Sequence, residues 1–471
     1  MAKGLKPSNY NVLFDLDDGT HLAFNAMSGG FAKISGGDYA ALKRLLDDPN
    51  AFVPANDQDE KFLDSAKRAR FVIEDDIDEY ELLRLRANVG KYSLGSFHLT
   101  IMPTLACNFA CPYCYENPVK GKMSAELQEG LCRWVDAKLE DTRRMTVGWF
   151  GGEPLLARDV VRNLSLRFVE MCRKHEVEYS GNITTNGYYL TPEVIDELDA
   201  MSVNMVQVTI DGPPEVHDLR RTTKRGKGTY HRIIQNLVSL CERTDKVKIA
   251  LRVNYDEVSI ARVPELLPLI PEPIKQRSHI YFRQVFPPPQ WWDAHEPTRS
   301  SSVSRETPSV DCLSLQKQAL DQGFTLLLTG YSPSAGYCEA DFINYFVLDP
   351  QCNLHKCTVA FDEEHRIGYV SAEGKATLDP KHMAKWMLRE TLERDNCRAC
   401  KILPLCMGGC SFTSLCSDGK KVCSTVNSQD CVVENLKLLY RNMALEKTRE
   451  AATQSTAAPL EAEAGQEAQA V

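Results

Sequence analysis

The sequence predicts an α/β fold in which parallel strands, covered by helices, close fully or partly into a barrel. Two observations predict it. Short apolar segments alternate with amphipathic helical segments from Phe97 to about Phe286, and this order is typical of consecutive βα units. Residues of distinctive chemistry follow several of these apolar segments. The carboxyl ends of parallel strands are where such sheets bind their ligands.

The expected strands are short and mostly apolar, as buried strands are. They are Phe97–Thr104, Met145–Phe150, Tyr179–Thr184, Met205–Ile210, Val247–Asn254 and His279–Val285. Between them, apolar residues share one helical face in Ser124–Leu139 and in Thr191–Met201. The segment before residue 95 predicts a small α+β module. Its strands Tyr10–Leu16 and His21–Phe24 flank an Asp-Asp-Gly turn, which is a hairpin signal. Its helices are expected over Asp38–Leu46 and Glu60–Arg70.

Composition excludes several classes of protein. The chain has 471 residues, of which 43% are hydrophobic, and a formal net charge of −9. This charge does not favour a nucleic-acid partner. No stretch of about 18 uninterrupted apolar residues exists, so no membrane span is expected. The first residues lack an apolar signal core, and we expect a cytoplasmic protein.

Cysteine is the unusual feature, with seventeen residues in a long chain. Clustered cysteines in a reducing compartment indicate metal binding more often than disulfides. Cys107, Cys111 and Cys114 have C-x3-C-x2-C spacing, which suits three corners of one iron–sulfur cubane. No fourth cysteine lies nearby, so one iron would stay open to a ligand. A zinc site completed by a distant residue such as His98 is the alternative.

This loop, with an aromatic residue before its last cysteine, resembles the signature of the radical S-adenosylmethionine (SAM) superfamily. The resemblance implies a partial (β/α)6 barrel and a [4Fe–4S] cluster whose open iron takes the amino and carboxylate groups of SAM. Reductive cleavage of the cofactor would then give a 5′-deoxyadenosyl radical that abstracts a hydrogen atom from the substrate.

Further motifs resemble cofactor contacts of the same superfamily. Gly151-Gly152-Glu153-Pro154 is similar to the motif that binds the methionine amino group. Less specific segments at later strand ends are Asp211-Gly212-Pro213, with His217 and Arg220, and Arg252-Val-Asn254. The residues expected to bind the cofactor are Gly151, Gly152, Glu153, Thr185, Asn186 and Arg252. No catalytic residue is assigned.

A second cysteine field resembles the SPASM domain, an auxiliary-cluster module. Its core is the C-x2-C-x5-C-x3-C run from Cys397 to Cys410. The resemblance implies two auxiliary [4Fe–4S] clusters, three in all. Cys338, Cys357 and Cys410 would hold the first, with Cys352, where the family has Gly, as an extra ligand. The second would be held by Cys397, Cys400, Cys406 and Cys423, with Cys431 competing for the last place and Cys416 left open. Two zinc ions are the alternative that spacing alone allows.

Four parts are therefore expected. Residues 1–95 form the N-terminal module, 96–310 the barrel, 311–445 the SPASM domain and 446–471 a disordered tail. The Pro- and Ser-rich stretch 287–308, which holds Trp291 and Trp292, is expected to be a surface loop.

The resemblance implies an oxidoreductase that modifies a peptide, with an external electron donor such as flavodoxin or ferredoxin. One interpretation is a maturase that forms a thioether or carbon–carbon crosslink in a ribosomally made precursor peptide. The other is an anaerobic sulfatase-maturating enzyme that makes formylglycine. In that group an Asp follows the second SPASM cysteine, whereas Thr358 follows Cys357 here. The N-terminal module favours the peptide maturase, because its hairpin offers an edge strand to a leader peptide. A non-catalytic cluster scaffold is a third, less favoured class.

Overall fold

We analysed a computed structural model of the chain. It describes residues 4–116, 119–285, 310–328, 332–361, 363–390, 392–393, 395–416 and 429–457. The expected loop over residues 287–308, Cys423 and the last fourteen residues lie outside this part of the chain.

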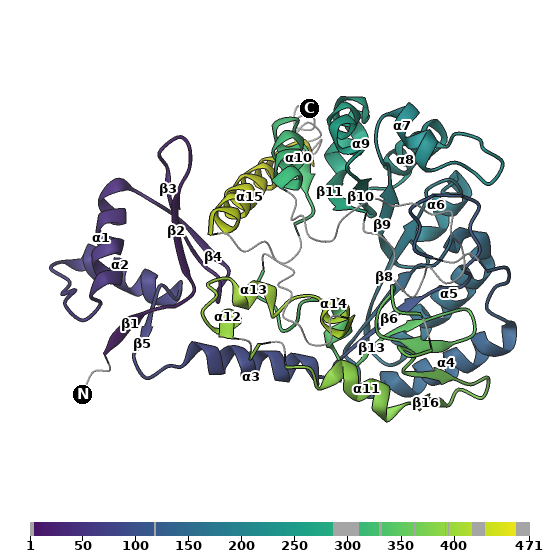
Figure 1. Ribbon diagram of the computed structural model, residues 1–471, viewed down its shortest axis with the longest axis horizontal. Helices are drawn as coiled ribbons and strands as arrows, with labels where there is room; N and C mark the ends of the chain where they lie inside the picture. The colour runs from purple at the N-terminus through teal and green to yellow at the C-terminus, as the bar shows by residue number, and fades with distance from the viewer. Residues whose placement is uncertain are drawn as a thin grey trace, which may run out of the picture.

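Six parallel strands form the centre of the molecule and confirm the predicted α/β fold (Figure 1). They pair in chain order, each with the next. The strands are β6 (Ser96–Ile101), β7 (Arg144–Trp149), β8 (Glu178–Thr185), β9 (Val203–Thr209), β10 (Lys248–Tyr255) and β11 (Ser278–Gln284). Each lies within about two residues of its predicted start, because long apolar runs leave little freedom in placing a buried strand.

Both edges of this curved sheet are extended by later segments. On one side β12 (Thr325–Leu326) pairs in parallel with β11. On the other side β13 (Tyr345–Leu348) pairs in parallel with β6, and an antiparallel meander follows it. The meander consists of β14 (Asn353–His355), β15 (Gly368–Val370) and β16 (Ala376–Leu378). The cysteine-rich segment therefore begins inside the barrel's own sheet.

Helices cover the outer face of the sheet (Figure 1). Their apolar residues form one large buried cluster with every second residue of the strands. The helices include α4 (Ala125–Leu139), α5 (Arg158–Lys174), α6 (Pro192–Leu198), α7 (Pro214–Arg220), α8 (Tyr230–Arg243), α9 (Glu272–Arg277) and α10 (Val310–Asp321). Ser124 caps the first by accepting a hydrogen bond from the Leu127 amide. The alternate strand residues face the barrel lumen.

The N-terminal module contains the predicted hairpin, extended by one more strand. β2 (Asn11–Asp15) and β3 (His21–Asn25) are antiparallel, and β4 (Gly30–Ile34) adds to the other side of β3. The edges of this sheet are therefore β2 and β4. Two short strands, β1 (Leu5–Pro7) and β5 (Val72–Glu74), pair separately. The helices are α1 (Gly36–Asp47), α2 (Asp57–Arg68) and α3 (Glu79–Lys91), which leads into the barrel.

The C-terminal helix α15 (Gln429–Ala457) runs from the N-terminal sheet to the barrel edge. Tyr440 packs against Phe31 of β4, with ring centroids 6.1 Å apart. Asn442 accepts a hydrogen bond of 2.7 Å from the Leu326 amide in β12. Arg449 donates to the carbonyl oxygen of Gln276 at 3.0 Å. These contacts correct the expectation of a disordered tail from residue 446, because the helix continues to Ala457. None of the helices in the described ranges is long and apolar enough to span a bilayer.

Candidate functional site

Three thiols gather in the loop after β6. This loop is held by a bridge between Phe109 and Thr223, and the Ala110 amide donates to the Thr222 carbonyl at 2.9 Å. Burial raises the pKa of Cys107 to about 11 and of Cys114 to about 12. The charge of Cys111 contributes to raising both pKa values. Buried thiols this close to one another are stabilised as thiolates when they bind metal.

The Gly-Gly-Glu-Pro turn after β7 lies against the backbone of this thiol loop. A Cβ atom on Gly151, whose φ is +106°, would come within 2.5 Å of the Thr104 carbonyl oxygen. A Cβ atom on Gly152 would overlap the carbonyl oxygens of Leu105 and Ala106. Only glycine therefore allows the two loops to approach so closely, which explains the glycine pair.

Glu153 joins the motifs predicted to bind the cofactor. Its carboxylate is fully buried and accepts hydrogen bonds from the Thr185 hydroxyl at 2.8 Å and from the Asn186 amide at 2.7 Å. The Asn186 side chain in turn donates to Asn108, next to Cys107. Burial raises the pKa of Glu153. The structure thus brings together residues 107–114, 151–153 and 185–186, as predicted from sequence.

A neighbouring carboxyl, Glu116, was not predicted. It is buried, and its burial and the charge of Glu153 raise the pKa of Glu116 to about 8. Its Oε2 atom is among the buried polar atoms that have no hydrogen-bond partner in the described part of the chain.

A buried polar network closes the other side of the thiol loop. Tyr113, the aromatic residue before the last cysteine, hydrogen-bonds to Asp211, and Arg221 donates to the Tyr113 hydroxyl at 2.8 Å. The charge of Arg221 favours a lower pKa of the Cys111 thiol. The Nε atom of Arg221 has no hydrogen-bond partner among the described residues. Sequence analysis singled out Arg220 instead, which also has unpartnered nitrogen atoms but forms ion pairs with Asp256 at 2.5 Å and Asp211 at 3.7 Å. Arg221 is therefore the better candidate for an anionic group of the cofactor.

Two further predicted residues have other surroundings. His217 is buried and bonds to Thr229 at 3.0 Å, so it supports the loop after β9. His98, the alternative zinc ligand, lies toward the amino end of β6, where Glu339 and Arg144 act on its pKa, which burial lowers. The structure does not bring His98 to the three thiols.

Three cysteines of the second field gather at the edge of the barrel. Burial raises the pKa of Cys338, and the charges of Cys357 and Cys410 raise it further. Cys352 lies apart from them. It is fully buried in the main core with a left-handed φ of 58°, and besides burial only Asp349 acts on its pKa, which is raised to about 12. The extra-ligand role expected for Cys352 is therefore not supported, because the turn after β13 points its thiol into apolar packing.

The remaining auxiliary cysteines adjoin the N-terminal sheet. Cys397 and Cys400 pack against a core cluster that includes Tyr10 and Leu83. Cys406 lies near Tyr337, beside the first group. Among the described residues, no three His, Cys, Asp or Glu side chains converge as ligands of a single metal ion do.

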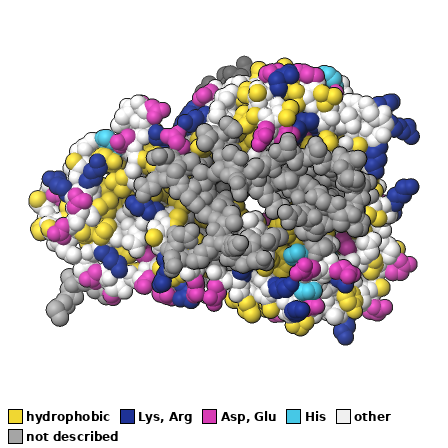
Figure 2. All heavy atoms as spheres, viewed as in Figure 1, with side chains coloured by type: hydrophobic (Ala, Val, Ile, Leu, Met, Phe, Trp, Pro, Cys, Tyr) yellow, Lys and Arg dark blue, Asp and Glu magenta, His cyan; other side chains and the backbone are white. Residues whose placement is uncertain are grey.

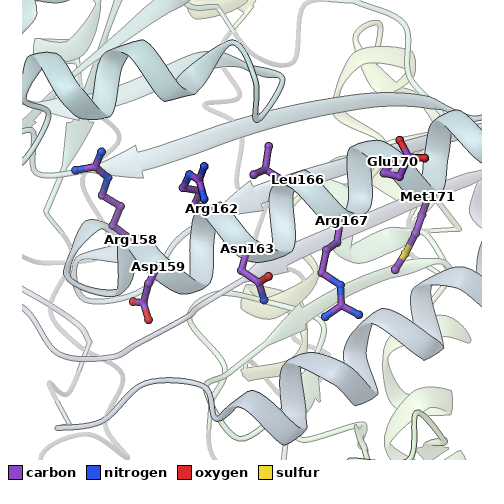
Figure 3. Close-up of a pocket in the computed structure, with 8 residues that line it drawn as sticks. All are labelled: Arg158, Asp159, Arg162, Asn163, Leu166, Arg167, Glu170 and Met171. Atoms are coloured by element: carbon purple, nitrogen blue, oxygen red, sulfur yellow. The ribbon is translucent and has the colours of Figure 1, made fainter.

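A surface depression of about 690 Å³ lies away from these residues. All the side chains that line it, from Arg158 to Met171, come from the outer face of α5 (Figure 3). Arg158 and Arg167 there pair with Glu197 and Glu129 of neighbouring helices. Charges of both signs are interspersed over the face seen in Figure 2.

Comparison with known proteins agrees with this geometry. The family model of the radical SAM superfamily matches residues 101–257. A serine-type anaerobic sulfatase-maturating enzyme of Klebsiella aerogenes is 24% identical over 69% of this chain and 82% of its own length. Mycofactocin maturase MftC of Mycobacterium tuberculosis is 27% identical over 68% of this chain and 81% of its own. The structure of native anSMEcpe with bound AdoMet and Cp18Cys peptide has a TM-score of 0.51 at 17% identity, over 77% of this chain and 99% of that one. Residues 101–257 therefore form a radical SAM domain, and the chain as a whole is similar to maturases of sulfatases and of mycofactocin.

Proposed function

We propose that this protein oxidatively modifies a ribosomally made precursor peptide, forming a thioether or carbon–carbon crosslink. The observation that carries this choice is Thr358, after Cys357. At this place formylglycine-forming enzymes are expected to have an Asp that serves as base. A threonine hydroxyl is not a base near neutral pH.

The residues of the thiol loop fit the first [4Fe–4S] cluster. Cys107, Cys111 and Cys114 supply three ligands, and SAM completes the site. When bound, the cluster and SAM supply a one-electron cleavage that yields a carbon radical able to take a hydrogen atom from the substrate. The protein contributes the surroundings of this chemistry.

The chain's own residues bind and orient the cofactor. Glu153 accepts hydrogen bonds from Thr185 and Asn186, which hold its carboxylate in place to accept from an ammonium group. Gly151 and Gly152 let this carboxylate approach the thiol loop. Arg221, buried beside Cys111, supplies positive charge for a carboxylate. We include Arg221 beside the residues predicted from sequence.

The auxiliary cysteines support a second part of the proposal. Cys338, Cys357 and Cys410 hold one auxiliary cluster, and Cys397, Cys400, Cys406 and Cys423 hold another. When bound, such clusters would supply one-electron redox chemistry or a ligand position near the substrate. We propose an external flavodoxin or ferredoxin as the electron donor. The edges of the N-terminal sheet, β2 and β4, are the proposed site for a leader peptide.

Formylglycine formation is the second candidate. The relatives that favour it are the sulfatase-maturating enzymes, which match most of this chain. Both candidate functions have a peptide substrate. They differ in which residue of the peptide is modified and in the product formed.

The test is anaerobic co-expression with the peptide encoded by a short reading frame beside the gene, followed by mass spectrometry. We expect loss of two hydrogens for each crosslink and no aldehyde. An aldehyde that reacts with a hydrazide reagent, formed at Cys or Ser of a sulfatase peptide, would favour the second candidate. Peptide left unmodified while SAM is cleaved would contradict both.

A further inference from the structure

The lumen face of the last two barrel strands carries two arginines. Leu251 and Val253 of β10 belong to the core cluster beneath the helices, so Arg252 between them faces the lumen. The same alternation on β11 turns Tyr281 and Arg283 to the lumen. Arg252 is the pairing partner of Tyr281 across the two strands. The two arginines are therefore diagonal neighbours on adjacent strands.

Neither arginine has a counter-charge among the described residues. Arg252 donates through Nε to the neutral side chain of Asn254 at 2.7 Å. No ion pair of the described part of the chain includes Arg252 or Arg283, although Arg220 nearby has both Asp211 and Asp256. Arg252 is half-buried and Arg283 is exposed. Positive charges that line a cavity without a counter-charge attract an anion.

The rest of this wall is polar but neutral. The Tyr281 hydroxyl donates to the Gln207 side chain at 2.6 Å, and that side chain donates to the Thr184 hydroxyl at 3.3 Å. Neutral hydrogen-bonding groups of this kind orient a ligand without offsetting charge. The two arginines thus make this part of the lumen wall favourable for an anion.

The arginines lie between the two cysteine sites. Arg252 is close enough to Tyr115, which follows Cys114, for its charge to favour a lower pKa of that tyrosine. Arg283 has the same effect on the pKa of Tyr337, which precedes Cys338. The two side chains therefore border the space between the thiol loop and the first auxiliary group.

We propose that Arg252 and Arg283 together bind a carboxylate of the peptide substrate, either an Asp or Glu side chain or the C-terminal carboxylate. This inference rests on the proposed function and deepens it, because it names the group by which the substrate is oriented. It assigns Arg252 to the substrate in place of the cofactor, for which Arg221 is the nearer cation. Bidentate arginine–carboxylate contacts supply the orientation that a selective reaction requires.

The competing explanation is that the arginines only offset the negative charge of thiolates at the auxiliary site. In that case the substitutions would shift the reduction potential of an auxiliary cluster and leave peptide preference unchanged. The two explanations therefore differ in what each substitution alters.

The test uses the anaerobically reconstituted full-length enzyme and a synthetic hexapeptide library. One half of the library carries Asp or Glu at a varied position and the other carries Asn or Gln, each with a free or amidated C-terminus. We expect wild-type enzyme to retain carboxylate-bearing peptides about tenfold over matched amides. Arg252→Gln and Arg283→Gln should reduce this ratio to about twofold or less, and Arg283→Glu should reverse it in favour of the amides. Iron content and melting temperature report whether each variant folds.

Arg173→Gln is the matched control, because Arg173 lies on the outside of α5 and pairs only with Glu170. It should retain the wild-type ratio. Dependence on the free C-terminus or on an internal acid identifies the source of the carboxylate. Peptides retained without preference for acids, or a preference that both Gln variants keep, would overturn the inference while leaving the proposed function intact. An enzyme that retains no peptide at all would contradict the proposed function, and this inference with it.

Discussion

Thr358 lies beside Tyr115, close enough to act on the pKa of the Tyr115 hydroxyl, which burial raises. Tyr115 follows Cys114 and Thr358 follows Cys357, so the thiol loop and the first auxiliary group are neighbours. Thr358 therefore faces the catalytic thiol loop at the place where formylglycine-forming relatives are expected to have a base.

Replacing one thiol of the loop after β6 should separate the catalytic site from the auxiliary sites. We expect Cys107→Ala, Cys111→Ala or Cys114→Ala to abolish formation of 5′-deoxyadenosine. About two thirds of the iron should remain, because the other thiols lie on separate segments. Chromatography of the reaction and iron quantitation check this. Cys241→Ala is the control, since that half-buried thiol on α8 donates to the Pro273 carbonyl oxygen at 3.5 Å and lies outside both cysteine groups. Persistent cofactor cleavage in the loop variants would refute the assignment.

Removing the charge of Glu153 should weaken SAM binding. A glutamine cannot accept from both Thr185 and Asn186 while also accepting from an ammonium group. We expect Glu153→Gln to lower affinity at least about tenfold, since a hydrogen bond to a charged group contributes about 1.5–3 kcal/mol. Equilibrium dialysis with labelled cofactor measures it. Glu129→Gln, on the outer face of α4 beside Arg167, should bind normally. Equal affinities for the two variants would show that Glu153 has only a structural role.

Cys352 and Cys357 should behave differently when each is replaced by alanine. The charge of Cys357 contributes to the raised pKa of Cys338, so the two thiols are neighbours. Cys352 is packed in the core, and no other cysteine affects its pKa. We predict that Cys357→Ala loses about one of three clusters by iron and sulfide quantitation. Cys352→Ala should keep all three and lose about 1 kcal/mol of stability. A cluster lost from Cys352→Ala would restore its predicted ligand role, and a wild-type content of one cluster would remove the SPASM interpretation.

An outward N–H group of β4 should be needed for leader binding. Neighbouring amides of an edge strand point in opposite directions, so only one of Ala32→Pro and Lys33→Pro removes an outward donor. We expect that variant to keep its melting temperature and to bind a fluorescein-labelled peptide from the adjacent reading frame about tenfold more weakly. The other variant should destabilise the sheet, because it breaks a bond to β3. Unchanged peptide affinity in a folded variant would exclude β4, and the same pair of tests applies to β2.

Deletion of the whole module is a poorer test of leader binding. Val12 and Phe14 share a buried cluster with Leu405 and Leu436 of the C-terminal region. The Tyr80 hydroxyl donates to the Leu392 carbonyl at 3.0 Å. Removing residues 1–90 would therefore expose a core beside Cys397 and Cys400. Loss of clusters after this deletion would report unfolding and not recognition.

The barrel and the residues around Glu153 could be predicted because their signals are local. Most strands carry apolar residues at alternate positions, and Gly151, Gly152 and Glu153 are adjacent in sequence. Thr185, an expected cofactor contact, lies beside Glu153 because consecutive parallel strands end at one edge of a sheet.

The remaining features depend on contacts between distant segments. β13 pairs with β6 across more than 240 residues, and its four-residue strand gives no local signal of that partner. Arg221 was missed because spacing cannot separate it from Arg220, and only the pairing of Arg220 with Asp256 does so. The burial of Cys352 is set by the turn after β13, which the cysteine pattern does not reveal.

Helix α15 contacts the N-terminal sheet along its first half and the barrel edge from its middle onward. Leu436 and Tyr440 pack against the cluster that includes residues of β2 to β4, whereas Asn442 binds the Leu326 amide of β12 and Arg449 donates to the Gln276 carbonyl. A helix is stiff along its axis, so a displacement at one of these two regions of contact is transmitted to the other. A tilt of the N-terminal sheet would therefore displace β12, the direct neighbour of the strand that carries Arg283. Binding of a leader peptide at this sheet, as proposed above, would thus be transmitted to the lumen wall beside Arg283.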